Sequence, residues 1–437
     1  MSAAGKRLIG GTVPAAMISA PASGSGKSMI TAALARLHRN AGRDVRVFKH
    51  GPDFLDPMVL EQASGNPVYQ LHPWMTGEAE CRWRLARAAQ DADLILVEGS
   101  MGLFDGEPSS ADLAMLADIP VIPVIDAWGM AQTFGAVAGG LATYRPDLRL
   151  SQVIANRVGS PGHGKMLVPA MPEGIELLGA VPRHEALSIP DRHLGIVQAS
   201  ELPELDASLD AAAEVLGEAG LDQLPEPVRL QSGPPEPAPR LLEGTRIAIA
   251  RDAAMAFSYR ANTDLLEAMG AELEFFSPLR DSRLPPADAL WLPGGYPELH
   301  AATLAANRSM REAIVQHHGA GKPILAECGG LMYCLDELVD EAGQAHPMLG
   351  LLPGRSVMTG KLMGLGIQSL EMEAGTLRGH TFHHSRLETD MEATAHTRRG
   401  AWDTPGEPVF TRDGLTATYF HAYFPSSPQA TAALFRK

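Results

Sequence analysis

Short apolar runs alternate with helix-like segments along the first half of the chain. The runs include VPAAMISA, DVRVFKH, DLILVEGS and IPVIPVIDA, and residues 27–40 and 77–90 are two of the helix-like segments between them. Strands that alternate with helices in this way form βαβ units, with parallel strands and helices on both faces of the sheet. We therefore predict a doubly wound, mostly parallel α/β domain in this half.

A proline-rich stretch then interrupts the alternation. Residues 224–244 (LPEPVRLQSGPPEPAPRLLEG) contain too much proline for a helix or a central strand. A second α/β alternation follows, from TRIAIARD to KPILAECGG, and the end of the chain has strand-like runs without long helices between them. The pattern predicts a first domain at residues 1–225, a linker at 226–243 and a second α/β domain at 244–437.

Composition limits the class of partner. The chain has 437 residues and 45% apolar content, which suits two or three domains with large cores. Its 36 basic and 51 acidic residues give a formal charge of -15, which disfavours nonspecific binding to nucleic acid or anionic membrane. We therefore expect a small-molecule substrate, with no nucleic-acid or membrane partner.

Cysteine usage and hydropathy predict a cytoplasmic protein. The three cysteines, at 81, 328 and 334, form neither a disulfide framework nor a CxxC pair, which favours a reducing compartment. The N-terminus shows no signal-peptide apolar run. Residues 127–146, with Arg145 as their one charge, are predicted to be a buried helix rather than a membrane span.

A phosphate-binding loop is predicted where a strand meets a helix in APASGSGKS. Glycines allow backbone N–H groups to face phosphate oxygens, the helix start adds partial positive charge, Lys27 adds a full charge, and Ser28 suits Mg²⁺. Pro21 replaces the first glycine of the GxxxxGK[ST] pattern, and the alternative is a glycine-rich turn without a ligand. The predicted nucleotide-binding residues are Ser23, Gly24, Ser25, Gly26, Lys27 and Ser28.

Carboxylates follow two other predicted strands. Glu98 ends the apolar run DLILVE, and ligands bind at the carboxyl ends of strands in doubly wound sheets, so Glu98 is predicted to reach Mg²⁺ beside Ser28. The alternative is a strand-end carboxylate that faces solvent. FKHGPDFLDP brings Lys49, Asp53 and Asp56 to the same edge, although an aspartate next to proline is more often a turn residue.

Cys328 lies at a predicted strand-to-helix turn in PILAECGGLMYCL. Gly329 and Gly330 follow it directly, as in a nucleophile elbow, and the helix end is expected to lower the pKa of the thiol. The ordinary alternative for a cysteine is core packing. Cys81 and Cys334 fit that alternative because no glycines flank them. We predict that Cys328 is a nucleophile.

A thiolate that attacks a carbonyl needs an oxyanion site and a base. LWLPGGYPELH places Gly295 at a strand end, where its backbone amide suits a developing oxyanion. His421 in TATYFHAYF is the predicted base on a late strand, where alternation puts Tyr419 and Tyr423 on the same face.

Three other histidines compete for the role of base. They lie in the HxxHH grouping of His380, His383 and His384. A metal site is the alternative for this grouping, and it is disfavoured because side chains diverge along a strand and no cysteine ligand lies nearby.

Together, AECGGLMYC, PGGYPELH and YFHAYF resemble the class I, triad-type glutamine amidotransferase domain. APASGSGKS, KHGPDFLDP and EGSMGLFDG are similar to the dethiobiotin-synthetase-like ATPase that is fused to such a domain in cobyrinate and hydrogenobyrinate a,c-diamide synthases. The resemblance covers nearly the whole chain, including GHTFHHS and the order ATPase, linker, glutaminase. It implies a P-loop doubly wound domain followed by a class I amidotransferase-like α/β domain.

The resemblance also implies the chemistry of a glutamine-hydrolysing carbon–nitrogen ligase of cobalamin biosynthesis. Glutamine is hydrolysed at Cys328 through a thioester, with His421 as base and acid. ATP and Mg²⁺ bind the first domain, where Asp53 belongs to the acyl-transfer site and an acyl phosphate is displaced by ammonia. The implied substrates are hydrogenobyrinic acid or cobyrinic acid, amidated at the a and c carboxylates, and the implied assembly is a homodimer.

Two alternatives stay open. One is the neighbouring cobyric acid synthase, which amidates other carboxylates of the same macrocycle. The other is a P-loop ATPase switch protein with a degenerate second domain, which should lack an intact cysteine elbow. Related amidotransferases carry an acidic residue two positions after the histidine, where this chain has Tyr423. A dyad is therefore expected, with weak glutaminase activity that rises when the synthetase site is occupied.

Overall fold

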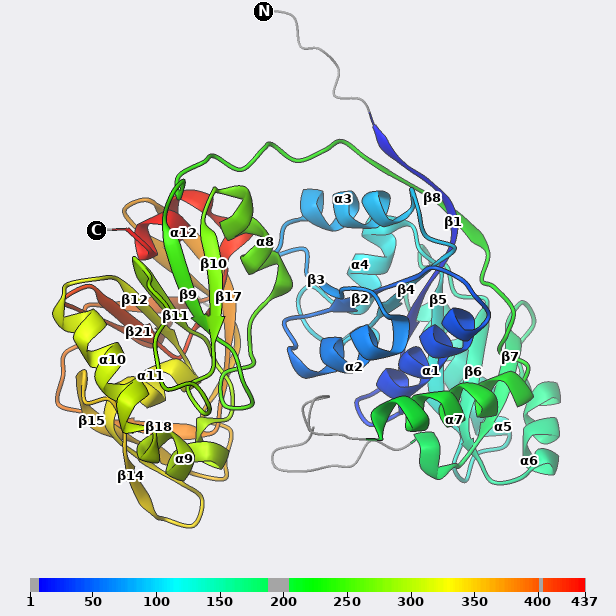
Figure 1. Cartoon of the computed structure of the whole chain (residues 1–437). Helices are drawn as coiled ribbons and strands as arrows, with labels where there is room; N and C mark the ends of the chain where they lie inside the picture. Colours follow the sequence, from blue (N-terminus) through cyan, green and yellow to red (C-terminus); the bar gives the residue numbers. More distant parts are fainter. Residues whose placement is uncertain (1–7, 188–203, 401–403, 437) are drawn as a thin grey trace, which may run out of the picture. The chain divides into compact units, whose positions relative to one another are not determined.

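The computed structural model describes residues 8–187, 204–400 and 404–436 (Figure 1). The chain divides into two compact units, Met1–Glu236 and Pro237–Lys437. The division falls inside the stretch 226–243 that the sequence predicts as a linker. In the described ranges, no helix is long and apolar enough to cross a membrane.

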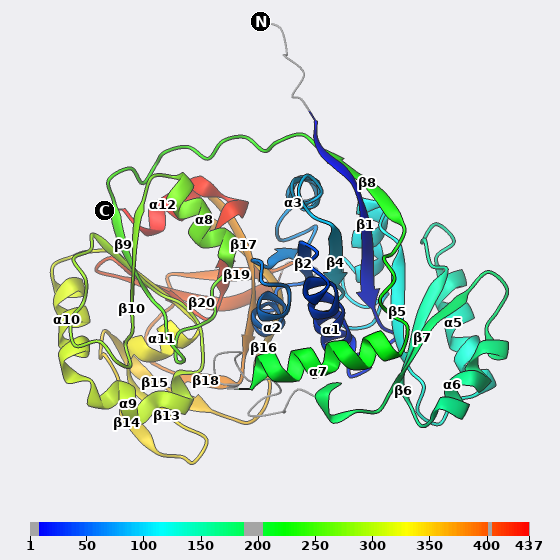
Figure 2. The same cartoon turned by 45° about the vertical axis from the view of Figure 1, so that its right-hand side comes forward.

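The first unit is built on a parallel sheet with strand order β3-β2-β4-β1-β5-β6-β7. Alternate residues of β1 enter different cores: Ala16 and Ile18 pack with α1, α2 and α7, whereas Ala15 and Met17 pack with α3 and α4. Helices therefore cover both faces, and α1 and α7 lie side by side on one of them (Figure 2). This arrangement is the doubly wound sheet that the alternation of apolar runs predicts.

The strands of this sheet are β1 (Ile9–Ser19), β2 (Val45–His50), β3 (Tyr69–Leu71), β4 (Leu94–Glu98), β5 (Val121–Asp126), β6 (Gln152–Val158) and β7 (Glu176–Pro182). The helices are α1 (Lys27–Asn40), α2 (Leu55–Ser64), α3 (Glu78–Ala88), α4 (Ser110–Ala117), α5 (Gln132–Tyr144), α6 (Pro161–Leu167) and α7 (Leu205–Glu218), with 3₁₀ turns η1 (Val168–Ala170) and η2 (Glu185–Leu187).

The structure differs from the sequence expectation in two places. Part of the predicted linker forms a strand, β8 (Pro227–Ser232), which pairs antiparallel with Ile9–Pro14 of β1. Val228 and Leu230 are buried in this strand, and its proline is the first residue, where no ladder hydrogen bond is lost. The helix predicted as buried, α5, buries only Phe134, Gly135 and Ala138, because one stripe faces the sheet and the rest faces outward.

The second unit contains a ten-stranded mixed sheet with order β10-β9-β11-β12-β21-β20-β19-β16-β17-β22. The strands from β10 to β21 are parallel, and the pairs from β20 to β22 are antiparallel. A smaller sheet has the order β14-β13-β15-β18. The change to neighbouring strands without long helices follows the pattern at the end of the sequence.

The strands of the second unit are β9 (Arg246–Ala250), β10 (Glu272–Phe276), β11 (Ala289–Leu292), β12 (Ile324–Glu327), β13 (Leu335–Val339), β14 (Ala345–Pro347), β15 (Leu352–Met358), β16 (Gly364–Met372), β17 (Gly375–His383), β18 (Ser385–Glu388), β19 (Ala395–Arg399), β20 (Thr404–Arg412), β21 (Leu415–Thr418) and β22 (His421–Tyr423). Its helices are α8 (Arg260–Ala268), α9 (Ala301–Ala306), α10 (Arg308–Gly319), α11 (Gly329–Cys334) and α12 (Pro428–Leu434), with 3₁₀ turns η5 (Pro297–His300) and η6 (Phe424–Ser426).

Candidate active sites

The predicted phosphate loop connects β1 to α1 at the carboxyl end of the sheet. Gly24 and Gly26 have φ angles of 82° and 92°, which side-chain-bearing residues rarely adopt. Asn156, in β6, donates from Nδ2 to the carbonyl oxygen of Ser25 at 2.9 Å. A Cβ on Gly26 would lie only 2.4 Å from the same nitrogen. Asn156 therefore supports the phosphate loop. The only sign of this role in the sequence is a polar residue within the apolar run of β6.

Ser28 and Glu98 lie together beside this loop, as the sequence predicts. The hydroxyl of Ser28 donates to Oε1 of Glu98 at 2.6 Å. Lys49 donates to the same oxygen at 2.8 Å and to Oδ2 of Asp56 at 2.5 Å. The second oxygen of Glu98, Oε2, is buried and has no hydrogen-bond partner among the described residues. A buried carboxylate oxygen next to a serine hydroxyl fits the oxygen ligands that Mg²⁺ prefers.

Burial and charge together determine protonation at this edge. Burial and the charge of Asp56 raise the pKa of Glu98 to about 7. Burial opposes the charge on Lys49, but the carboxylates of Asp56 and Glu98 outweigh it and raise the pKa of Lys49. Burial and the neighbouring charge of Lys49 lower the pKa of Lys27. Lys49 therefore stays a cation that compensates two buried carboxylates.

Asp53 occupies the turn before α2. Its Oδ1 accepts hydrogen bonds from the backbone amides of Leu55 at 2.7 Å and Asp56 at 2.9 Å. This is the turn contact that the sequence left open as the alternative for this residue. Burial and the charge of Asp56 raise the pKa of Asp53, and the charge of Lys49 opposes them.

Cys328 lies between β12 and α11 with φ 49° and ψ −103°. A non-glycine residue in this region is strained, as expected for the nucleophile of a sharp strand-to-helix turn. The turn is fixed by the Cys328 amide, which donates to the carbonyl oxygen of Thr418 at 2.7 Å. A Cβ on Gly330 would lie 2.0 Å from the carbonyl oxygen of Leu292, so only glycine allows this close approach.

The Gly295 amide nitrogen lies close to the start of α11. A Cβ added to Gly329 would lie 3.0 Å from the amide nitrogen of Gly295, so the two glycines are in close contact beside Cys328. Gly295 is itself packed against the Ala254 carbonyl, because a Cβ there would lie 2.1 Å from that oxygen. The predicted oxyanion residue therefore lies next to the predicted nucleophile.

The imidazole of His421 is buried and lies against Gly294. A Cβ on Gly294 would lie 2.3 Å from Cε1 of His421. Burial, assisted by the charge of His383, lowers the pKa of His421 to about 3. The ring is therefore neutral at physiological pH and is able to accept a proton.

The predicted lowering of the Cys328 pKa is wrong. Burial raises the pKa of the thiol, and the charge of Glu298 raises it further, whereas the Gly329 amide lowers it less. The helix that follows, α11, has only six residues, and its weak dipole does not offset burial in an apolar core. Cys328 is therefore a thiol that must lose its proton when it attacks.

Two of the three competing histidines, His383 and His380, have different surroundings. His383 faces the Ser385 carbonyl through Nδ1 at 2.9 Å and Glu407 Oε1 through Nε2 at 3.3 Å, so both nitrogens are engaged. His380 faces the hydroxyl of Tyr259 through Nδ1 at 2.7 Å. In the described part of the chain, no group of three or more His, Cys, Asp or Glu side chains is arranged to hold a metal ion.

Comparison with known proteins matches each of the two units to a domain family. The CobQ/CobB/MinD/ParA nucleotide binding domain matches residues 16–196, and the CobB/CobQ-like glutamine amidotransferase domain matches residues 246–429. The hydrogenobyrinate a,c-diamide synthase of Pseudomonas aeruginosa is 56% identical over 421 residues, 96% of this chain and 97% of that protein. The cobyrinate a,c-diamide synthase of Herminiimonas arsenicoxydans is 49% identical over 96% of each chain.

The chain belongs to the hydrogenobyrinate and cobyrinate a,c-diamide synthase family. Membership confirms the resemblance, the fold class and a glutamine-hydrolysing, amide-forming ligase, and the first unit is a nucleotide-binding domain.

Glu327 lies at the glutaminase site but is not among the residues that the sequence predicts there. It directly precedes Cys328, is fully buried, and accepts hydrogen bonds from Trp291 Nε1 and the Ala422 amide, both at 2.8 Å. Burial raises its pKa to about 7. Because Ala422 directly follows His421, this one carboxyl group links the backbones of the predicted nucleophile and base. The signal in the sequence was a charged residue at the end of an apolar strand.

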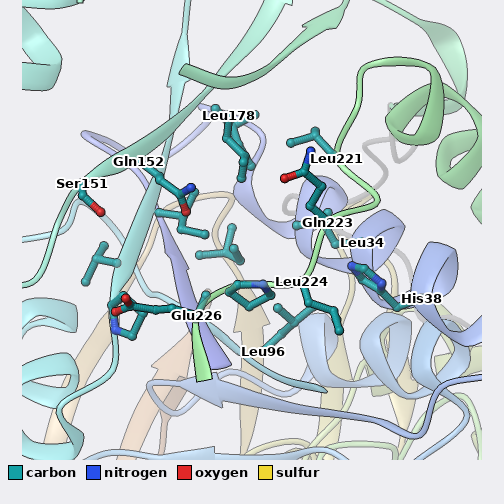
Figure 3. Close-up of a pocket in the computed structure, with 17 residues that line it drawn as sticks. Leu34, His38, Leu96, Ser151, Gln152, Leu178, Leu221, Gln223, Leu224 and Glu226 are labelled. Carbon is teal, nitrogen blue, oxygen red and sulfur yellow. The ribbon is translucent and has the colours of Figure 1, made fainter. Parts of the chain in front are cut away.

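The first unit also has a cavity of about 150 Å³, and none of the predicted site residues lines it (Figure 3). Leucines line much of it, and Gln152, Gln223 and Glu226 add polar groups. Burial lowers the pKa of His38 there to about 4, so this histidine is neutral. The cavity borders the core between the sheet and α1, and no residue of the phosphate loop lines it.

Proposed function

We propose that the chain amidates the a and c carboxylates of hydrogenobyrinic acid or cobyrinic acid in cobalamin biosynthesis, with glutamine as nitrogen donor and ATP as the energy source. The observation that carries the proposal is similarity over 96% of the chain to an enzyme named hydrogenobyrinate a,c-diamide synthase. The nucleophile turn and the phosphate loop, both present with their neighbouring groups, support it.

In the glutaminase reaction, Cys328 attacks the side-chain amide carbon of glutamine while His421 accepts the thiol proton. The amide of Gly295 donates to the oxyanion. His421 then returns the proton to the leaving nitrogen, ammonia departs, and water hydrolyses the thioester. The close packing of Gly295 on Gly329 and the neutral state of His421 support these roles.

In the synthetase reaction, the residues from Ser23 to Ser28 bind the phosphates of ATP, and Lys27 provides a positive charge at the transferred group. Ser28 and Glu98 would hold Mg²⁺, which neutralises phosphate charge when bound. A substrate carboxylate attacks the γ-phosphorus, ADP leaves, and ammonia displaces phosphate from the acyl phosphate. Asp53 belongs to this acyl-transfer site, and its position before α2, near Lys49, supports that role.

We also propose that residues 1–225 are the synthetase domain, 226–243 the linker and 244–437 the glutaminase domain of a cytoplasmic homodimer. The division of contacts between Glu236 and Pro237 supports a boundary in the linker. Sedimentation velocity of the full chain tests the homodimer, and a monomer at micromolar concentration contradicts it.

The decisive experiment follows the mass of each macrocycle incubated with the protein, Mg²⁺, ATP and glutamine. A Cys328→Ala variant receives glutamine or ammonium in parallel. We expect a diamide from the wild type and, from the variant, a diamide with ammonium only. Amidation beyond two carboxylates would favour a cobyric acid synthase, and ATP turnover without any mass change would favour an ATPase switch protein.

The missing acidic neighbour of His421 predicts a slow free-enzyme glutaminase. Glutamine hydrolysis should accelerate when ATP and the macrocycle are both present. A hydrolysis rate that neither compound changes would contradict this coupling.

A further inference from the structure

His421 needs a group that fixes its ring, because an imidazole that rotates about its side-chain bonds transfers protons poorly. Tyr423 occupies the place where related amidotransferases carry an acidic residue. Its ring is buried and meets the ring of Tyr259 edge-on, with centroids 5.5 Å apart. Tyr423 therefore packs against Tyr259, the residue before α8, and it does not supply a carboxylate to the base.

His380 lies directly opposite His421 in the sheet. Strands β17 and β22 pair antiparallel with His380 and His421 in register. The two rings are stacked, with centroids 5.1 Å apart and planes 19° from parallel. Both side chains are buried, at 5% and 2% exposed, so the stack is formed inside the protein. A flat ring at this distance restricts rotation of the His421 imidazole.

The residue before His380 allows this approach. A Cβ on Gly379 would lie 1.9 Å from the carbonyl oxygen of His421, so no other residue permits β17 and β22 to pair this closely. Gly379 pairs with Ala422 in the same register. The backbone pairing therefore places His380 and His421 opposite each other, where their rings stack.

Tyr259, directly before α8, fixes the other side of His380. Its hydroxyl lies 2.7 Å from Nδ1 of His380, and a phenol satisfies that nitrogen in either tautomer because it both donates and accepts. Asn262, in the first turn of α8, donates to the Ala422 carbonyl and accepts from the Phe424 amide, both at 2.8 Å. One helix start therefore contacts the stack and the backbone around His421.

We propose that His380, fixed by Tyr259, is a positioning residue that sets the imidazole plane of His421 for proton transfer from Cys328. The inference rests on the proposed role of His421 as the base. His380 exchanges no proton with substrate in this proposal. Its contribution is the orientation that a carboxylate gives the histidine in a full triad.

The test measures glutamine hydrolysis by the full chain in His380→Ala, His380→Phe and Tyr259→Phe variants. A misplaced base lowers turnover and leaves substrate binding intact, so His380→Ala should lower kcat about tenfold or more without changing KM. His380→Phe keeps a flat ring in the stack but loses the hydrogen bond to Tyr259, so its kcat should fall about fivefold, less than that of His380→Ala. Tyr259→Phe should lower kcat about fivefold, the effect of about one hydrogen bond.

Two controls separate positioning from general damage. His346→Ala removes another buried histidine of the same unit, one paired with Asp340 at 2.8 Å, and should leave kcat unchanged. Ammonium-dependent amidation should be unchanged in every variant. Equal losses in His380→Ala and His380→Phe, or a rise in KM with unchanged kcat, would overturn the positioning role.

A His421→Ala variant distinguishes failure of this inference from failure of the proposed function. If His421→Ala abolishes glutamine hydrolysis while His380→Ala has the wild-type kcat, only the positioning role is wrong. If His421→Ala keeps the wild-type rate, the base is another group, and both the proposed role of His421 and the positioning role fall, whereas the mass experiment still decides the amidation itself.

Discussion

Gly294→Ala tests the position of the proposed base with the smallest possible change. The new Cβ would lie 2.3 Å from Cε1 and 3.1 Å from Nδ1 of His421. Ordinary contact begins at 3.4 Å, so the ring must move by about 1.1 Å (3.4 − 2.3) or the strand end must shift equally. Because the ring is buried and stacks on His380 of β17, it has little room to move without leaving that stack.

The size of the effect follows from this displacement. A misplacement of about 1 Å at a reacting group costs about 100-fold in rate, or about 2.7 kcal/mol of activation free energy. We therefore expect the kcat for glutamine hydrolysis to fall about 100-fold. Ammonium-dependent amidation should continue at the wild-type rate, because the phosphate loop and Glu98 belong to the other unit.

The assay compares glutamate release with ammonium-dependent amidation in the same preparation. Gly319→Ala is the matched control: it lies at the end of α10 in the same unit, and nothing lies within 4 Å of its added Cβ. Both variants should show cooperative thermal unfolding near the wild-type temperature. A Gly294→Ala enzyme with normal glutamine turnover would refute the assignment of His421, because the base would tolerate a displacement that proton transfer does not allow.

Three other substitutions test separate parts of the molecule. Burial raises the pKa of Glu327 to about 7 in the folded protein, so folding favours the protonated carboxyl group. The free energy of unfolding of the wild type should therefore fall by up to about 3 kcal/mol as pH rises from about 4.5 to 7. Glu327→Gln should therefore gain apparent Tm relative to wild type between pH 5 and 8, and parallel Tm curves would contradict this. The Glu98→Gln variant should lose amidation with glutamine and with ammonium, and so should the wild type treated with EDTA. Glutamine hydrolysis by the free enzyme should continue in both cases. Amidation that persists in either case would contradict the proposed role of Glu98 as a Mg²⁺ ligand. Asn156→Ala removes one hydrogen bond to the phosphate loop, about 1 kcal/mol, and should weaken ATP binding about fivefold in calorimetry; unchanged affinity would show that the loop keeps its shape alone.

The sequence was sufficient for features that depend on local chain geometry. Parallel strands present their carboxyl ends at one edge, so the alternation of strands and helices is enough to place Ser28 and Glu98 together. In the structure the Ser28 hydroxyl oxygen lies 2.6 Å from Oε1 of Glu98. The glycines after Cys328 likewise indicated the strained turn, because few other sequences permit it. In both cases the prediction needed only neighbouring residues and a general rule of sheet topology.

Features that depend on long-range packing were not predictable from one chain. Asn156 contacts Ser25 across 131 positions, and Glu327 contacts the Ala422 amide across 95. The predicted downward shift of the Cys328 pKa is wrong for the same reason, because the shift depends on how completely the surrounding core covers the sulfur. Strand β8 was missed because its alternation is short and prolines surround it.

The protonation states at the two predicted glutaminase residues explain why a dyad should be slow on its own. Burial raises the pKa of Cys328 and lowers that of His421 to about 3, so the neutral pair is strongly favoured over thiolate and imidazolium. Glu298, Glu407 and Glu327 all raise the thiol pKa further. Proton transfer must therefore accompany carbon–sulfur bond formation, and this step requires a correctly oriented His421 ring. An arrangement that fixes this ring, such as the stack with His380, then contributes more to turnover than it would beside a preformed thiolate.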